Sequence, residues 1–110
     1  MTTPSTSETP RAAVLSLRGD VDFFTEDAFR AEAEQLLADA DVESFVVDFE
    51  HVEMLDSSGL SLLVDLLRLC REMGLPMVLR SVPERVRQLL DLTGLDQVMP
   101  IEDAADRGAP

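Results

Sequence analysis

Two adjacent serine hydroxyls, those of Ser57 and Ser58, lie between Asp56 and Gly59 at the junction of two hydrophobic segments. A serine at a helix start can cap the helix by accepting hydrogen bonds from free backbone N–H groups. It can also be a phosphorylation site, because a helix N-terminus favours an anion. The residue pattern alone favours capping, with Asp56 or Ser57 as the better-placed cap. Gly59 is expected to let the backbone of another chain approach closely.

The flanking segments predict that this junction connects a strand to a helix. Residues 44–49 are β-prone, and the consecutive pair Val46 and Val47 is typical of a central strand buried on both faces. Residues 60–73 are apolar at helical spacing with one narrow polar stripe, so we expect a mostly buried helix. Gly74 is expected to end this helix.

The rest of the chain alternates between strand and helix patterns. Further strands are expected at residues 12–17, 77–79 and 98–101, the last as an edge strand because it contains a proline. One helix is expected to start from Thr25 as N-cap, and another from a capping box at residues 81–84 and to end at Gly94. This order predicts an α/β fold with a mixed, mostly parallel sheet of four to five strands.

Length and composition indicate one small soluble domain. We expect a domain at residues 11–103, a disordered Thr/Ser/Pro-rich tail at residues 1–10 and a frayed acidic end at residues 104–110. The chain carries a net charge of −13, which argues against nucleic acid and anionic membranes as partners and favours a basic protein, or solubility alone. Without a signal peptide or a long apolar run, the protein is expected to be cytoplasmic. The single cysteine, Cys70, is expected to be a small buried hydrophobe.

The sequence lacks the common enzyme motifs. It has no glycine-rich phosphate loop and no lysine, and its one histidine is His51. A triad of Ser58, His51 and an aspartate would also need an oxyanion hole and an orienting acid. We therefore expect no catalytic residues, no metal and no cofactor, so the protein is not predicted to be an enzyme.

A receiver-like domain, phosphorylated on an aspartate, is a second possibility. Asp48 and Asp56 are its candidate acceptors, and Asp20 and Asp22 could imitate the acidic pair that such domains use to bind Mg²⁺. The lysine that such domains normally need is absent. An acid-stable phosphate would exclude this alternative.

Three stretches of the chain resemble the STAS family of anti-sigma factor antagonists. They are Leu17–Asp22, then Val46–Phe49 with Met54–Leu60, and finally Leu75–Leu79 with Val86–Leu90 and Thr93–Asp96. The middle stretch is the most specific, and together they span about Val14 to Ile101. Ser61 departs from the family, which often has Gly or Ala there. The N-terminal strand and the C-terminal helix of many relatives have little sequence to form them.

The resemblance implies a small STAS-like fold with helices packed on one face of the sheet. It implies that Ser58 is the phosphoacceptor, with Asp22, Asp56, Ser57 and Gly59 as its neighbours. Unphosphorylated members bind an anti-sigma factor that is also a serine kinase, and thereby release a sigma factor. The kinase then phosphorylates the serine and the complex breaks, and a PP2C-type phosphatase reverses the modification. An unphosphorylated STAS scaffold, or a subunit of a transport or stress-sensing assembly, is the alternative.

Overall fold

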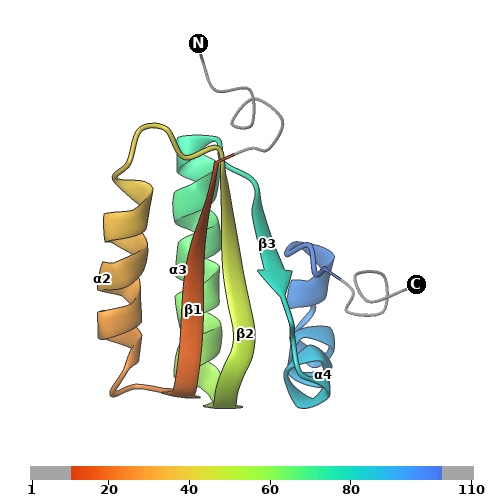
Figure 1. Ribbon diagram of the computed structural model, residues 1–110. Helices are drawn as coiled ribbons and strands as arrows, with labels where there is room; N and C mark the ends of the chain where they lie inside the picture. The colour runs from red at the N-terminus through yellow and green to blue at the C-terminus, as the bar shows by residue number, and fades with distance from the viewer. Residues whose placement is uncertain (1–10, 103–110) are drawn as a thin grey trace, which may run out of the picture.

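A computed structural model of the chain describes residues 11–102, which form a parallel sheet and three α-helices (Figure 1). The elements are β1 (Ala12–Val21), α2 (Glu26–Leu37), β2 (Ser44–Leu55), α3 (Ser57–Met73), β3 (Met77–Arg80), α4 (Glu84–Thr93) and a 3₁₀ turn, η1 (Leu95–Gln97). This alternation confirms the predicted α/β fold class. The predicted tail at residues 1–10, residue 103 and the predicted end at residues 104–110 lie outside the described residues.

The sheet has the order β1-β2-β3, and both strand pairs are parallel. Four to five strands were expected, and residues 11–102 form three. The predicted edge strand at residues 98–101 is reduced to one bridge between Leu79 and Ile101. Pro100 has no N–H to continue a ladder, and the N–H groups of Val98 and Met99 bond back to Leu95. The last segment therefore touches the sheet at a single point.

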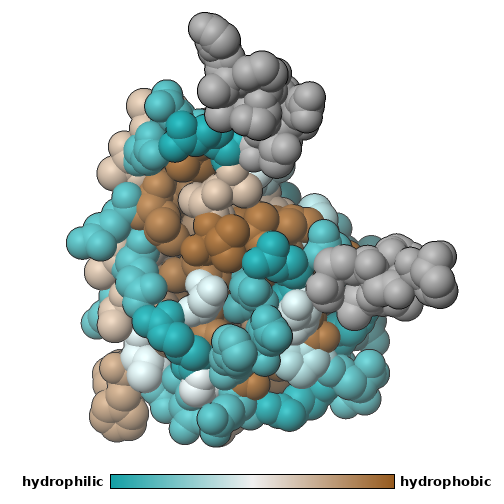
Figure 2. All heavy atoms as spheres, viewed as in Figure 1, coloured by the Kyte–Doolittle hydropathy of each residue, from teal (hydrophilic) through white to brown (hydrophobic). Residues whose placement is uncertain are grey.

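One face of the sheet is covered by helices. Figure 1 shows α3 behind the sheet, with α2 and α4 to either side of it. Alternate residues of β1 are buried, among them Leu15 and Leu17, as expected for a strand with one covered face. Val47 is fully buried whereas its neighbour Val46 is partly exposed, so the prediction that this strand is buried on both faces was wrong. Figure 2 shows the uncovered face, where hydrophobic residues gather over the middle of the sheet.

Both long strands extend beyond their predicted ends. The sequence Arg18-Gly19-Asp20 was expected to terminate the first strand, but β1 continues to Val21 through register shifts on either side of Gly19. At the shift between Gly19 and Asp20 the extra residue is Glu53 of β2, and Gly19 itself adopts a φ of 67°, which glycine reaches without steric cost. The second strand likewise reaches Leu55, which pairs with Val21. As a result, β1 and β2 end side by side.

The helix boundaries confirm two predicted ends, at Gly74 and Gly94, and the predicted N-cap position Thr25, and they correct the predicted start of α4. Gly74 has φ 72° and closes α3, with the Gly74 and Leu75 N–H groups bonded to the Arg71 and Cys70 carbonyls as in a Schellman motif. The predicted capping box before α4 is wrong, because Pro83 is the N-cap and makes no side-chain cap bond. Thr25 is the N-cap residue of α2, as predicted, but its hydroxyl donates to the Asp20 carbonyl at 2.8 Å and makes no cap hydrogen bond.

Candidate functional site

Ser57 and Ser58 lie in the first turn of α3, at the carboxyl edge of the parallel sheet. Only Asp56 separates the end of β2 from the start of α3. Ser57 is exposed to solvent and Ser58 is partly exposed. Ligands and partners of parallel sheets commonly meet this edge, because the connections after several strands converge there.

Asp56 is the N-cap of α3. Its Oδ1 accepts hydrogen bonds from the backbone N–H of Ser58 at 2.9 Å and of Gly59 at 3.3 Å. The Asp56 N–H in turn donates to the Val21 carbonyl at 3.3 Å, which ties the cap to β1. This resolves the choice between Asp56 and Ser57 as the cap. Among the described residues the Ser58 hydroxyl has no hydrogen-bond partner, so it is not used for capping.

Gly59 is buried where α3 passes over the strand ends. A Cβ at this position would lie 2.6 Å from Leu55 Cγ and 2.8 Å from the Val21 carbonyl oxygen. The close approach expected at Gly59 is therefore made by the chain's own β1 backbone. Only glycine allows the first turn of α3 to sit this close to the sheet, and that contact fixes the position of Ser58.

Asp22 lies at the same edge and shapes the turn between β1 and α2. Its Oδ1 accepts hydrogen bonds from the N–H groups of Phe24 at 2.9 Å and Thr25 at 3.2 Å. Its own N–H donates to the Thr25 hydroxyl at 3.0 Å. The structure thus brings the predicted neighbour Asp22 to the edge that carries Ser58. Its carboxylate stabilises the β1–α2 turn, and no hydrogen bond joins it to Ser58 within residues 11–102.

Acidic side chains around Ser58 are not neutralised. Within the described part of the chain, Asp20, Asp22, Glu53 and Asp56 make no ion pair. The Arg85 guanidinium bonds to the Glu53 carbonyl, not to a carboxylate. A phosphate added to Ser58 would therefore lie on an acidic surface whose carboxylates are not paired with any arginine of residues 11–102.

Two residues of the competing chemistries, His51 and Asp48, lie away from the Ser58 turn. His51 is exposed within β2 opposite Arg18, several residues before the turn. Asp48 bonds to Arg80 at 3.0 Å. Burial would raise the pKa of the Asp48 carboxyl, but hydrogen bonds from the Glu50 N–H and the Arg80 guanidinium outweigh it and hold this pKa below its ordinary value. Asp48 thus belongs to an ion pair within the sheet.

Cys70 is fully buried in α3, as predicted. Burial raises the pKa of its thiol to about 11. A thiol in this state is a poor nucleophile, because the thiolate is the reactive form.

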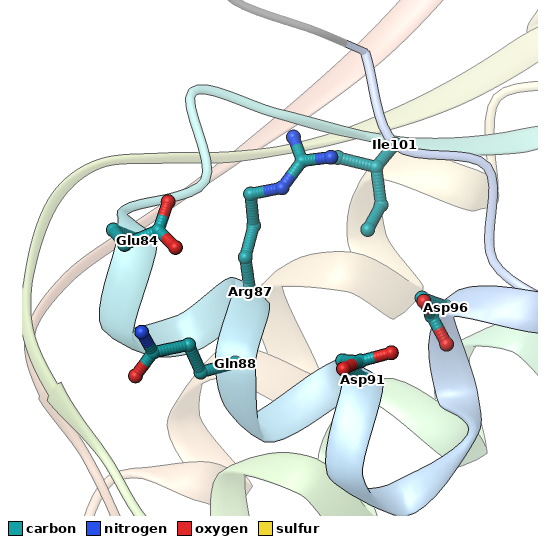
Figure 3. A pocket seen from close by; sticks show the side chains of 6 residues that line it. All are labelled: Glu84, Arg87, Gln88, Asp91, Asp96 and Ile101. Carbon is teal, nitrogen blue, oxygen red and sulfur yellow. The ribbon is translucent and has the colours of Figure 1, made fainter.

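Three further features of the described residues were considered as sites: a surface pocket, metal-binding side chains and membrane-spanning helices. A polar pocket of about 470 Å³ lies against α4, where Arg87 extends toward Ile101 and Glu84, Asp91 and Asp96 also line the pocket (Figure 3). Residues 11–102 contain no group of three or more side chains suited to hold a metal ion. The helices of this same range are too short or too polar to span a bilayer.

Sequence reasoning missed two residues at this edge, Phe23 and Phe24. Their side chains are 70% and 87% exposed. The sequence feature that could have identified them is the presence of two aromatic residues in an acidic turn, where no core position was expected.

The fold and site define a small α/β domain that presents a serine at a capped helix N-terminus. The sequence matches the STAS domain family over residues 3–107, and the chain belongs to this family. It is 30% identical to the "Anti-sigma F factor antagonist" of Paenibacillus polymyxa, over 82% of this chain and 77% of that protein.

Solved structures share the fold. An anti-sigma factor antagonist from Mycobacterium paratuberculosis is 31% identical with a TM-score of 0.68, over 87% of this chain and 80% of that one. The Bacillus protein SpoIIAA in its phosphorylated form is 24% identical with a TM-score of 0.66, over 90% and 92%. A sulfate transporter family protein from Wolinella succinogenes is 18% identical with a TM-score of 0.68, over 86% and 78%. The last two likenesses concern the fold alone.

Proposed function

We propose that this protein is an anti-sigma factor antagonist controlled by phosphorylation of Ser58. In its unphosphorylated form it binds an anti-sigma factor that is also a serine kinase, and the sigma factor is released. It works in the cytoplasm without catalysis of its own. The carrying observation is the Ser58 hydroxyl, which is partly exposed and unbonded within the described residues beside a cap that Asp56 already supplies.

The transfer step needs only a hydroxyl from this chain. Ser58 Oγ attacks the γ-phosphorus of ATP held by the kinase, its proton passes to a base of the kinase, and ADP leaves. A PP2C-type phosphatase returns the hydroxyl by hydrolysis, with inorganic phosphate as the other product.

The phosphate would act at the interface and not by refolding the chain. It adds about −1.5 to −2 charges. Asp56 already occupies the Ser58 and Gly59 N–H groups, so the new anion gains little from the helix and must stay hydrated. The kinase must hold a nucleotide against Ser58, so phosphoserine would face nucleotide phosphates of like charge. A coupling of about 1–3 kcal/mol would weaken binding about 5–150-fold.

Calorimetric titration with the anti-sigma factor serine kinase proposed as the partner tests the proposal. Unphosphorylated protein should bind, and protein phosphorylated on Ser58 should bind about 5–150-fold more weakly. Ser58→Ala should bind as tightly as the wild type and should keep this affinity after incubation with ATP. Ser57→Ala should lose affinity after incubation with ATP, as the wild type does. If ATP weakens the binding of Ser58→Ala as well, Ser58 is not the switch.

A constitutive scaffold, as a subunit of a transport or stress-sensing assembly, is the second candidate. The observation in its favour is the Asp56 carboxylate, which already fills the N-terminus of α3 that a phosphate would otherwise use. Equal capture of one partner by the wild type and by Ser58→Asp would support this scaffold over the switch.

A further inference from the structure

Phe23 and Phe24 are the most conspicuous apolar side chains at the edge that carries Ser58. They are 70% and 87% exposed, and their rings contact edge to face with centroids 5.7 Å apart. Two phenyl rings in water forgo about 1.5–3 kcal/mol each relative to burial. Residues 11–102 contain no group that covers them. An exposed aromatic pair of this kind is typical of a binding surface.

The turn that carries the pair is held rigidly by its own hydrogen bonds. The Asp22 carboxylate accepts from the N–H groups of Phe24 and Thr25, and the Thr25 hydroxyl donates to the Asp20 carbonyl at 2.8 Å. The Asp22 N–H completes the turn by donating to the Thr25 hydroxyl at 3.0 Å. A preorganised turn loses little conformational entropy when a partner covers it, which favours tight binding.

The pair and Ser58 belong to adjacent connections of the same sheet edge. Val21 pairs with Leu55, and the two turns follow directly after these residues. In Figure 1 both connections lie at the lower end of the sheet. A partner that reaches Ser58 from this end therefore also meets the turn that holds Phe23 and Phe24.

The surroundings specify the charge of that partner. Asp20, Asp22, Glu53 and Asp56 lie in or beside these two connections and form no ion pair within the described residues. A complementary surface has an apolar pocket for the rings and arginine or lysine residues around it.

We infer that Phe23 and Phe24 are the apolar anchor through which the anti-sigma factor kinase docks, in a pocket bordered by basic residues. The inference rests on the proposed function and adds the recognition element. Anchor and switch are separate: the rings supply affinity that does not depend on charge, whereas the state of Ser58 decides whether the complex persists.

Truncation of the two rings tests this division of roles. Phe23→Ala and Phe24→Ala should each raise the Kd for the proposed partner kinase about tenfold, and the double variant should raise it about a hundredfold. The control is Leu92→Ala, which removes a side chain that is 81% exposed in the last turn of α4. It should change the Kd less than about twofold. Thermal unfolding of all variants should match the wild type, since the rings are exposed.

Phosphorylation kinetics and salt dependence separate an anchor from a catalytic or purely electrostatic role. Phe24→Ala should raise KM for phosphorylation with kcat nearly unchanged, because the ring contributes equally to ground state and transition state. The dependence of Kd on salt should keep its slope in Phe24→Ala, because the acidic border is intact.

Three outcomes would overturn the inference. If the double variant binds the kinase as tightly as the wild type, the anchor is wrong while the proposed function stands. If sedimentation shows a wild-type dimer that the double variant cannot form, the rings join two copies of this chain instead. If the wild type does not bind the kinase at all, the proposed function fails and the inference fails with it.

Discussion

Gly59 lies against Val21 so closely that a Cβ on the glycine would be 2.8 Å from the valine carbonyl oxygen. This contact joins the first turn of α3 to the last residue of β1. The Asp56 N–H reinforces it by bonding to the same carbonyl oxygen at 3.3 Å. The position of Ser58 therefore depends on two elements that are distant in the sequence.

Gly59→Ala should destabilise the fold. The added methyl meets backbone and a branched carbon, neither of which can move away cheaply, and overpacking of this kind costs about 1–3 kcal/mol. The better helix propensity of alanine offsets up to about 1 kcal/mol of this loss. Urea unfolding should show a net loss of about 1–2 kcal/mol, and phosphorylation of the variant should be slower.

Gly94→Ala is the matched control for this substitution. A Cβ there meets nothing within 4 Å, but Gly94 has φ 79°, which costs alanine about 1 kcal/mol. Gly94→Ala should lower stability only by the cost of its positive φ angle and should leave the rate of phosphorylation unchanged. A wild-type unfolding curve for Gly59→Ala would contradict the close approach.

Asp56→Ala should lose about 1 kcal/mol of stability, within a range of about 0.5–2 kcal/mol, because two N–H groups lose their acceptor. Asp56→Asn should keep most of it, since asparagine caps about as well. Ser57→Ala should be nearly neutral in the same urea experiment. A larger loss for Ser57→Ala than for Asp56→Ala would mean that the cap is misassigned.

The hydrophobic periodicity was sufficient to predict the order of the three strands and three helices and the mostly parallel sheet, and the glycines predicted where α3 and α4 end. Local patterns were not sufficient where long-range contacts decide. Two register shifts, at which β2 has one residue more than β1, let the pairing of the two strands continue to Val21 and Leu55. Pairing of the strand ends is what brings Asp22 and Ser58 to one edge, and no window of sequence contains that information.

The Asp48–Arg80 pair should make stability depend on acid pH. The pKa of Asp48 is lower in the folded chain than in the unfolded one, so the folded state binds fewer protons and stability rises with pH. The contribution is fully present above the ordinary aspartate pKa of about 3.9 and is lost as the pH falls through the folded value. Asp48→Asn should cost about 1–2 kcal/mol near pH 7 and much less near pH 2.

Asp27→Asn is the control for this pH series. Asp27 also pairs with an arginine, Arg30, but its side chain is 93% exposed. Urea unfolding between about pH 7 and pH 2 should show a small effect of this variant throughout, as for surface pairs in general. A cost of Asp48→Asn that stays constant down to the acid end would argue against the lowered pKa.

Cys70 should be inert in the folded protein. Its thiol is buried and has a pKa of about 11. At pH 8 its reaction with a disulfide reagent should be more than about a hundredfold slower than in the unfolded chain. In denaturant one thiol per chain should react. Rapid labelling of the native protein would contradict the burial of α3.

The aromatic pair illustrates a different limit of sequence reasoning. Phe23 and Phe24 have the composition of core residues, and only the path of the β1–α2 turn leaves them in solvent. Their exposure follows from the hydrogen bonds between Asp22, Phe24 and Thr25 that shape this turn. From the sequence, only a helix N-cap at Thr25 was predicted here.

The central claim is that Ser58 is the phosphoacceptor, and site-resolved mass spectrometry tests it most directly. The wild type, Ser57→Ala and Ser58→Ala would each be incubated with the proposed partner kinase and ATP. We predict a gain of about 80 Da that survives acid in the first two proteins, with the fragment ions locating it on Ser58, and no gain in Ser58→Ala. A phosphate on Ser58→Ala, or an acid-labile phosphate on an aspartate, would contradict the account.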